Sequence, residues 1–228
     1  HFYPLFGPNW AKNFPKDGPG LVEKTEAVRA IMRRYNISKP VIITEAGWHN
    51  NSTIPYGDDT LQVRYVQKLY TQALASGVPM LAWWPFSDVG GAYTYNSGLV
   101  TEDGSTLKPA YYAYGVFARE MAGVTFVAEI EASDDVKVYK FHDDAKNRTV
   151  FVAWTNPTEL SSAFGTALVP YKDTTRSTTI TLTGDSATAY DAFWTAVAHV
   201  TDGGDGKTDR RLKVAINGDP KYIVVEGN

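Results

Sequence analysis

A single glutamate stands at the polar end of an apolar stretch of this chain. Glu45 follows a β-branched run that extends from Val41 to Thr44, and a run of this kind is typical of a strand in a parallel sheet covered on both faces. Because side chains alternate along a strand, Val41, Ile43 and Glu45 share one face. A carboxylate that ends an inward-facing apolar row can act in catalysis, or it can cap the next helix or pair with an arginine. The pattern alone leaves both interpretations open.

Large aromatic side chains gather in the same half of the sequence. Ten of the fourteen Tyr and four of the six Trp precede residue 125, so this half is expected to hold the ligand site. Trp83 and Trp84 end a second apolar run and, as neighbours in a strand, face opposite ways. Trp10 and Trp48 fall in expected loops, where large aromatic side chains more often face a ligand than the core.

Helical patterns alternate with these two strands. Apolar residues recur at helical spacing over 20–35 and 58–74, and a proline opens a third helix over 109–121. The alternation predicts an α/β layer with a parallel sheet. In a parallel α/β barrel the catalytic groups lie at the C-terminal ends of the strands, and both Glu45 and Trp84 hold that position.

The pattern of polar and apolar residues changes after Gly123. Polar and apolar residues then alternate, separated by Gly, Asp and Asn turn clusters, which predicts a small antiparallel β-sandwich. The alternating stretches are 136–141, 149–154, 177–183 and 212–216. The predicted fold class is therefore α/β plus all-β, with an α/β part at 1–123 and a β-sandwich at 124–228. No flexible linker separates the two parts, so we expect them to pack together.

Composition excludes several classes of function. The net charge of −3 provides no basic face for nucleic acid, and no apolar run reaches membrane-spanning length. Without cysteine there is no disulfide framework and no thiolate nucleophile. A secreted protein of this size does not need disulfides, so secretion stays possible. The four His lack the spacing of a zinc site, and neither a phosphate-binding loop nor a Gly-x-Ser-x-Gly elbow occurs. No metal and no cofactor are predicted, and the cellular compartment is left open.

Four motifs in a fixed order resemble the C-terminal part of a known enzyme clan. Residues 43–48 (ITEAGW) resemble the seventh strand of retaining (β/α)8 glycoside hydrolases, and residues 81–88 (LAWWPFSD) resemble the eighth. Segments within 98–112 resemble the loop and helix that follow, and residues 1–4 (HFYP) resemble the end of the sixth strand. The resemblance covers about residues 1–122. It implies a partial (β/α)8 barrel, with strands resembling the sixth to the eighth, ahead of the β-sandwich.

The resemblance also implies roles for individual residues. Glu45 is expected to be the nucleophile in retaining hydrolysis of a β-glycosidic bond. Trp84 is expected to stack on a pyranose ring, while Asp88 either bonds sugar hydroxyls or caps its loop. Tyr3, with His1 as a second candidate, is expected to donate a hydrogen bond that keeps the nucleophile ionised. A buried barrel aromatic is the alternative for Tyr3.

The same resemblance implies that residues 1–228 supply the nucleophile and the sugar platform but not the general acid. In the clan that acid follows an Asn at the end of the fourth strand, and no Asn-Glu pair occurs in the sequence. Glu102 and Asp103 fall in a loop and Glu120 in a helix, away from a strand end. We therefore expect an oligosaccharide or polysaccharide substrate and an N-terminal barrel segment on a separate chain, with a second copy of this chain as the weaker option.

Two further interpretations remain. A noncatalytic carbohydrate-binding protein would keep Trp84 and the sandwich without turnover. Alternatively, the sandwich itself could bind sugar through Trp154 and Trp194, although both are more simply explained as sandwich core. The sequence fixes neither the sugar and its linkage nor exo or endo action.

Overall fold

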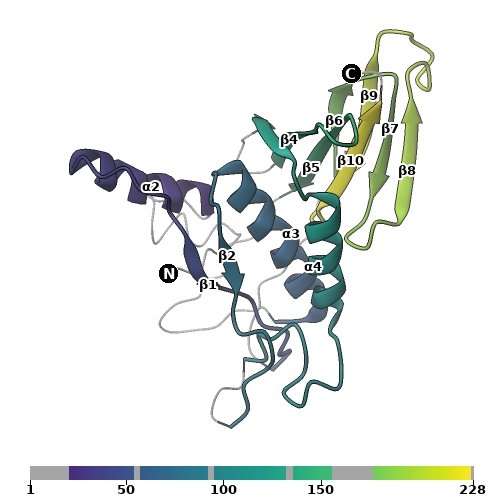
Figure 1. Cartoon of the computed structure of the whole chain (residues 1–228). Helices are drawn as coiled ribbons and strands as arrows, with labels where there is room; N and C mark the ends of the chain where they lie inside the picture. Colours follow the sequence, from purple (N-terminus) through teal and green to yellow (C-terminus); the bar gives the residue numbers. More distant parts are fainter. Residues whose placement is uncertain (1–20, 54–56, 92–94, 132–135, 156–176, 227–228) are drawn as a thin grey trace, which may run out of the picture. The chain divides into compact units, whose positions relative to one another are not determined.

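The computed structural model of the chain describes residues 21–53, 57–91, 95–131, 136–155 and 177–226 (Figure 1). His1, Tyr3 and Trp10 lie outside the described residues. The described part divides into two compact units, one ending at Tyr114 and the other beginning at Gly115. The domain boundary after Gly123 stays a prediction, since the two units meet within a helix.

The first unit alternates strands and helices as the sequence predicted. Its elements are α2 (Leu21–Arg34), β1 (Ile43–Ala46), α3 (Asp59–Ala75), β2 (Leu81–Trp83) and the first half of α4 (Pro109–Glu120). β1 and β2 pair in parallel and lie side by side in Figure 1. Because parallel neighbours need a long crossover connection, α3 has to lie between them in the sequence. The parallel pairing is confirmed, and the described residues form no closed barrel.

Helix α3 begins and ends at residues suited to those positions. The Asp58 side chain accepts a hydrogen bond from the Leu61 N–H at 2.7 Å, which satisfies one of the free amides of the first turn. The helix stops before Gly77, which has a φ of 59° that glycine adopts without strain. Tyr65 and Leu69 of this helix pack with Ile43 of β1 and other apolar residues in one buried cluster. The core of the first unit thus lies between α3 and the two strands.

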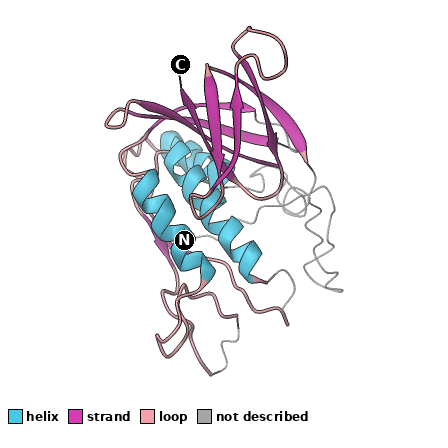
Figure 2. Ribbon diagram, turned by 90° about the vertical axis from the view of Figure 1, so that its right-hand side faces the viewer, coloured by secondary structure: helices cyan, strands magenta, loops and turns pink. Residues whose placement is uncertain are grey.

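Helix α2 presents two faces of different character. Leu21 and Thr25 are fully buried, and the helix packs beside α3 (Figures 1 and 2). Val28, Ile31 and Tyr35 follow each other at spacings of three and four residues, so they form one stripe on the helix and the turn after it. Their exposed fractions are 38%, 61% and 65%. We call these three residues the α2 stripe, an apolar surface left open to solvent.

The second unit is built from antiparallel strands, drawn in magenta in Figure 2. Six of them form one sheet in the order β3-β4-β5-β10-β7-β8, and two form a smaller sheet, β6-β9. Their bounds are β3 Thr125–Glu131, β4 Val136–Asp143, β5 Arg148–Thr155, β6 Thr178–Thr183, β7 Ser186–Tyr190, β8 Ala196–Thr201, β9 Arg211–Ile216 and β10 Lys221–Glu226. Overall, the chain is a mixed α/β protein in which most pairing is antiparallel.

Register irregularities in the large sheet occur at its two edges. The pairings β3 with β4 and β7 with β8 contain shifts. The inner pairings β4 with β5, β5 with β10 and β10 with β7 run without a shift over the described residues. The sheet is therefore regular inside and bulged along both outer strands.

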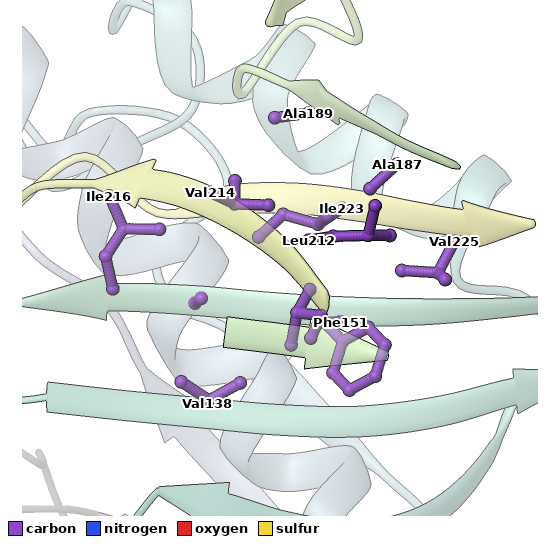
Figure 3. Packing of buried hydrophobic residues seen from close by; sticks show 11 residues of the cluster. Val138, Phe151, Ala187, Ala189, Leu212, Val214, Ile216, Ile223 and Val225 are labelled. Atoms are coloured by element: carbon purple, nitrogen blue, oxygen red, sulfur yellow. The ribbon is translucent and has the colours of Figure 1, made fainter. Parts of the chain in front are cut away.

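The two sheets share one hydrophobic core (Figure 3). Leu212, Val214 and Ile216 of β9 are buried while the residues between them are exposed, as expected for a strand with one face on a core. They meet residues of the large sheet such as Phe151 and Ile223. The alternation that the sequence showed over 212–216 is confirmed.

The two tryptophans of the second unit pack against other side chains, Trp154 fully buried and Trp194 half-buried. Trp154 is fully buried and stacks on Tyr139, with ring centroids 5.3 Å apart. Trp194 stacks on Tyr190 at 4.6 Å, and the Arg148 guanidinium lies 5.3 Å from its ring centroid. Both indoles therefore have protein neighbours, and the full burial of Trp154 favours the core interpretation for that residue. Separately, no helix within the described ranges is long and apolar enough to cross a membrane.

Candidate functional site

A bulge shapes the end of β1. Ile43 pairs with Leu81 and Ala46 pairs with Trp83, so three steps along β1 match two along β2. The extra residue breaks the alternation, and as a result Ile43 and Ala46 are both buried, Thr44 is exposed and Glu45 is half-buried. The prediction that Ile43 and Glu45 share a face assumed that side chains alternate regularly along the strand. The shift in register between Ile43 and Ala46 removes that assumption. Bulges occur often beside active sites because they re-aim a side chain.

Trp83 at the end of β2 and Trp84 directly after it have different surroundings. The Trp83 indole N–H donates to the Ser97 carbonyl at 2.9 Å, and its ring lies edge-on to Tyr65. Trp83 packs against the core of the first unit, whereas Trp84 is 39% exposed. Trp83 is therefore half-buried against the core, and Trp84 keeps the accessible surface that a sugar platform needs. Its role as a platform stays a prediction.

Glu45 and Trp84 lie next to the last residue pair of the two strands, Glu45 before it and Trp84 after it. Each adjoins a member of the Ala46 and Trp83 pair, and the Trp84 N–H donates to the Ala46 carbonyl at 2.9 Å. A Cβ atom added to the buried Gly47 would lie only 2.4 Å from the Trp84 carbonyl oxygen. The backbone after β1 and the backbone after β2 are therefore in close contact at the two strand ends that carry Glu45 and Trp84, although α3 separates the strands in the sequence.

The loop after β1 contains Trp48 and His49. Trp48 stacks on Tyr65 with ring centroids 5.2 Å apart and packs against the core of the first unit. His49 is buried, and Tyr95 meets it edge-on at 5.7 Å. One face of the Trp48 ring is thus occupied by protein. The binding role expected for Trp48 stays a prediction and would have to use the rest of its surface.

Asp88 is held inside the protein by its own neighbours. Its Oδ1 accepts hydrogen bonds from the Gly98 N–H at 2.8 Å and from the Lys108 ammonium at 2.7 Å. The Asp88 side chain is 10% exposed and that of Lys108 is 6% exposed. These contacts favour the loop-capping interpretation of Asp88 over direct contact with sugar hydroxyls.

Two other carboxylates are poor candidates for a general acid. Hydrogen bonds from the Thr101 hydroxyl and from Ser105 lower the pKa of Asp103 to about 2. Burial alone would raise the pKa of Glu120, but hydrogen bonds from Arg119, Lys146 and Arg148 outweigh it and lower the pKa. A general acid needs a raised pKa so that it holds its proton near neutral pH. Both groups remain ionised there.

The described residues include no cluster of three or more His, Asp or Glu side chains placed to bind a metal ion. His1 and Tyr3 lie outside the described residues, so their roles beside Glu45 remain predictions. The sequence analysis assigned no role to Lys108, which lies within the segment 98–112. The sequence hardly indicates a role for this residue, because the hydrogen-bond partners Asn50 and Asp88 lie 58 and 20 residues away from Lys108.

Comparisons with known proteins bear on the fold. No family model and no curated protein matches the sequence. Among solved structures, a family 39 glycoside hydrolase from the gut symbiont Bacteroides cellulosilyticus WH2 aligns with a TM-score of 0.63 and 21% identity, over 89% of this chain and 38% of its own. A Paenibacillus polymyxa xyloglucanase from glycoside hydrolase family 44 aligns with a TM-score of 0.53 and 9% identity, over 93% of this chain and 38% of its own.

The chain has a glycoside hydrolase-like fold. It spans about two fifths of the length of these two structures. The identities are low enough that the likeness concerns the fold, and chemistry has to be argued from the site itself.

Proposed function

We propose that this chain takes part in retaining hydrolysis of β-glycosidic bonds, with Glu45 as the nucleophile and Trp84 as the floor of the sugar subsite. The observation that supports this most directly is the joining of the two strand ends: the Trp84 N–H bonds the Ala46 carbonyl beside the bulge that contains Glu45. In the proposal β1 and β2 belong to a (β/α)8 barrel, in which such strand ends form the active site. The antiparallel unit is then the β-sandwich that follows the barrel.

The reaction requires two carboxyl groups in different protonation states. The ionised Glu45 attacks the anomeric carbon and forms a covalent glycosyl-enzyme, which water then hydrolyses. The second carboxyl, roughly 5 to 5.5 Å away, protonates the leaving oxygen and later activates the water. Neither Asp103 nor Glu120 suits this second role, because the pKa of each is lowered. In our proposal the general acid comes from an N-terminal barrel segment on a separate chain.

The α2 stripe supports such a partner. Val28, Ile31 and Tyr35 expose an apolar helix face, although burying apolar surface is favourable by roughly 25 cal/mol per Å². Ile42, beside the bulged strand, is 49% exposed as well. Contiguous exposed apolar residues commonly mark a surface that another segment covers. The preceding helix of the barrel would pack on this side of α2.

The nucleophile can be tested separately from the acid by the choice of leaving group. A dinitrophenyl β-glycoside with fluorine at its second carbon releases an anion that needs no proton, and the fluorine slows hydrolysis of the glycosyl-enzyme. Purified 1–228 should gain the mass of one fluoroglycosyl group, and peptide sequencing should place it on Glu45. Glu45→Gln should stay unlabelled, while the loop variant Glu102→Gln should label like wild type. Label on another residue, or equal labelling of Glu45→Gln, contradicts the assignment.

If a separate segment supplies the general acid, as proposed, two kinds of substrate should behave differently. The chain alone should react with the activated dinitrophenyl glycoside but leave methyl glycosides and oligosaccharides intact, because their leaving groups require protonation. Adding the upstream barrel segment should restore hydrolysis of the unactivated substrates. A well-folded monomer that hydrolyses unactivated glycosides at enzyme-like rates contradicts the need for a partner.

A noncatalytic carbohydrate-binding protein is the second candidate function. The exposed indole of Trp84 favours it, since an aromatic platform binds sugar whether or not an acid is present. Such a protein would retain a polysaccharide in affinity electrophoresis, would lose that retention in Trp84→Ala, and would never label on Glu45. The fluoroglycoside experiment therefore separates the two candidates.

A further inference from the structure

A buried ammonium group lies behind the two strand ends. The Nζ atom of Lys108 lies 2.7 Å from Asp88 Oδ1, 3.0 Å from Asn50 Oδ1 and 3.0 Å from the Asn96 carbonyl oxygen. A lysine ammonium has three donor hydrogens, so this geometry provides an acceptor for each of them. The group is only 6% exposed and is charge-paired with Asp88, which offsets the cost of removing it from water.

The acceptors come from three separate segments of the first unit. Asn50 belongs to the loop after β1, Asp88 to the loop after β2, and Asn96 to a returning segment that is also bonded to both loops. The Asn50 N–H donates to the Asn96 carbonyl at 3.2 Å, and the Gly98 N–H donates to Asp88 Oδ1 at 2.8 Å. Lys108 itself directly precedes α4. One side chain thus connects the loops that continue from Glu45 and from Trp84.

The returning segment fits closely against the loop after β2. A Cβ atom added to Gly98 would lie 2.2 Å from the Asp88 backbone nitrogen, and the Ser97 carbonyl accepts the Trp83 indole N–H. Gly98 is followed by Leu99, whose N–H donates to the Phe86 carbonyl at 2.8 Å. Loss of the Lys108 contacts should therefore loosen this segment, and hydrogen exchange at its amides can detect that change.

We propose that Lys108 is a positioning residue that fixes Glu45 relative to Trp84 by tying the loops after β1 and β2 together. The inference rests on the proposed function for its catalytic consequence. The ion pair alone is weak evidence of a stabilising role, because a buried salt bridge adds little compared with apolar residues of similar size. What it does supply is geometry: three acceptors at fixed directions hold three segments in one arrangement. A shift of about 1 Å between reacting groups can slow a reaction by roughly 10²-fold.

The test compares a full and a partial release of the loops. Lys108→Met removes all three contacts. Asn50→Ala removes the Asn50 Oδ1 contact with Lys108, together with the 2.7 Å bond from Asn50 Nδ2 to Asp59 Oδ1, and leaves the ion pair and the Asn50 N–H bond to Asn96 in place. Lys137→Met is the matched control, since Lys137 is also largely buried and paired, with Glu129 at 3.2 Å in the second unit. In ¹⁵N-labelled protein, hydrogen exchange at the Gly98 amide and at the Trp83 indole reports the loops. The maximal rate of labelling by the dinitrophenyl fluoroglycoside reports the reaction.

The expected results differ between the variants. Lys108→Met should speed exchange at both reporter groups by at least roughly tenfold, as local opening becomes easier. It should also lower the maximal labelling rate by about 10²-fold. Asn50→Ala should lower the labelling rate while thermal stability and exchange at Gly98 stay near wild type. Lys137→Met should change neither readout.

Each outcome bears on one hypothesis. If wild type labels and both Lys108→Met and Asn50→Ala label at the wild-type maximal rate, Lys108 has no positioning role. If the labelling rate falls only in proportion to thermal stability, the residue is structural and the inference is overturned. If wild type does not label at all, the proposed function fails, and unchanged exchange in Lys108→Met then overturns the loop connection as well. Should Lys108→Met fail to fold, Asn50→Ala still decides between positioning and stability.

Discussion

Replacing Gly47 with alanine should push apart the two strand ends at the candidate site. The added Cβ would lie 2.4 Å from the Trp84 carbonyl oxygen, and ordinary contact begins near 3.4 Å, so the two backbones have to separate by about 1 Å. Neither atom can rotate away, because one is fixed to the backbone and the other belongs to it. A similar displacement would lengthen the 2.9 Å bond from the Trp84 N–H to the Ala46 carbonyl beyond hydrogen-bonding range.

The magnitude follows from these two losses. Overpacking a buried site costs about 1 to 3 kcal/mol, and a lost hydrogen bond costs about 1 kcal/mol more. We therefore expect Gly47→Ala to lower the free energy of unfolding by about 2 to 4 kcal/mol in urea titrations followed by circular dichroism. Labelling of Glu45 should slow by roughly 10²-fold.

The matched control for this substitution is Gly115→Ala. Gly115 lies within α4, and a Cβ added there meets nothing within 4 Å. Alanine is the better helix former, so the control should stabilise the protein by about 0.4 to 1 kcal/mol. If Gly47→Ala unfolds within about 0.5 kcal/mol of wild type, a difference typical of an unstrained surface change, the close approach of the strand ends is not as described.

Three further predictions concern other parts of the molecule. Trp84→Ala should weaken binding of a sugar ligand, measured by calorimetric titration, by about 1 to 3 kcal/mol through lost stacking. Unchanged affinity would show that another surface binds the sugar. Trp154→Ala should lower the free energy of unfolding by about 3 to 5 kcal/mol, because the residue is fully buried; a cost below about 1 kcal/mol would contradict that burial. The lowered pKa of Glu120 means that its contribution to stability is present above the unfolded-state pKa, about 4.3, and is lost as pH falls through the lower folded-state pKa. Glu120→Gln should therefore lose less stability than wild type in melts between about pH 5 and pH 3, and parallel curves would refute the ion-pair network.

The regular elements of the chain were predictable from the sequence. Each helix of the first unit has an apolar period and a suitable start or stop residue, such as Asp58 before α3. The parallel pairing of β1 and β2 followed from the alternation of strands and helices. In the second unit the one-sided burial of β9 showed directly in the alternation of residue types, whereas β5, where a looser alternation was predicted over 149–154, is buried on both faces. Local patterns of this kind depend on neighbouring residues, which the sequence displays.

The site was less predictable because its geometry depends on distant contacts. Nothing in the run from Val41 to Glu45 reveals the bulge, since the extra residue exists only relative to the register of β2. Trp48 was expected in a ligand-facing loop, but its stacking on Tyr65 is a contact between residues 17 positions apart. The catalytic role of Glu45 and the binding role of Trp84 stay predictions until labelling and titration test them.

The bulged edges of the large sheet limit where the chain can safely be shortened. β3 shields β4, an eight-residue strand that pairs with β5 without any shift in register. A truncation that begins after Glu131 would make β4 the outer strand and expose a long, regular row of backbone donors and acceptors. Edges of that kind recruit strands from other molecules, whereas bulged edges resist it. A shortened form that keeps Thr125–Glu131 should therefore stay soluble, whereas one that lacks it should aggregate.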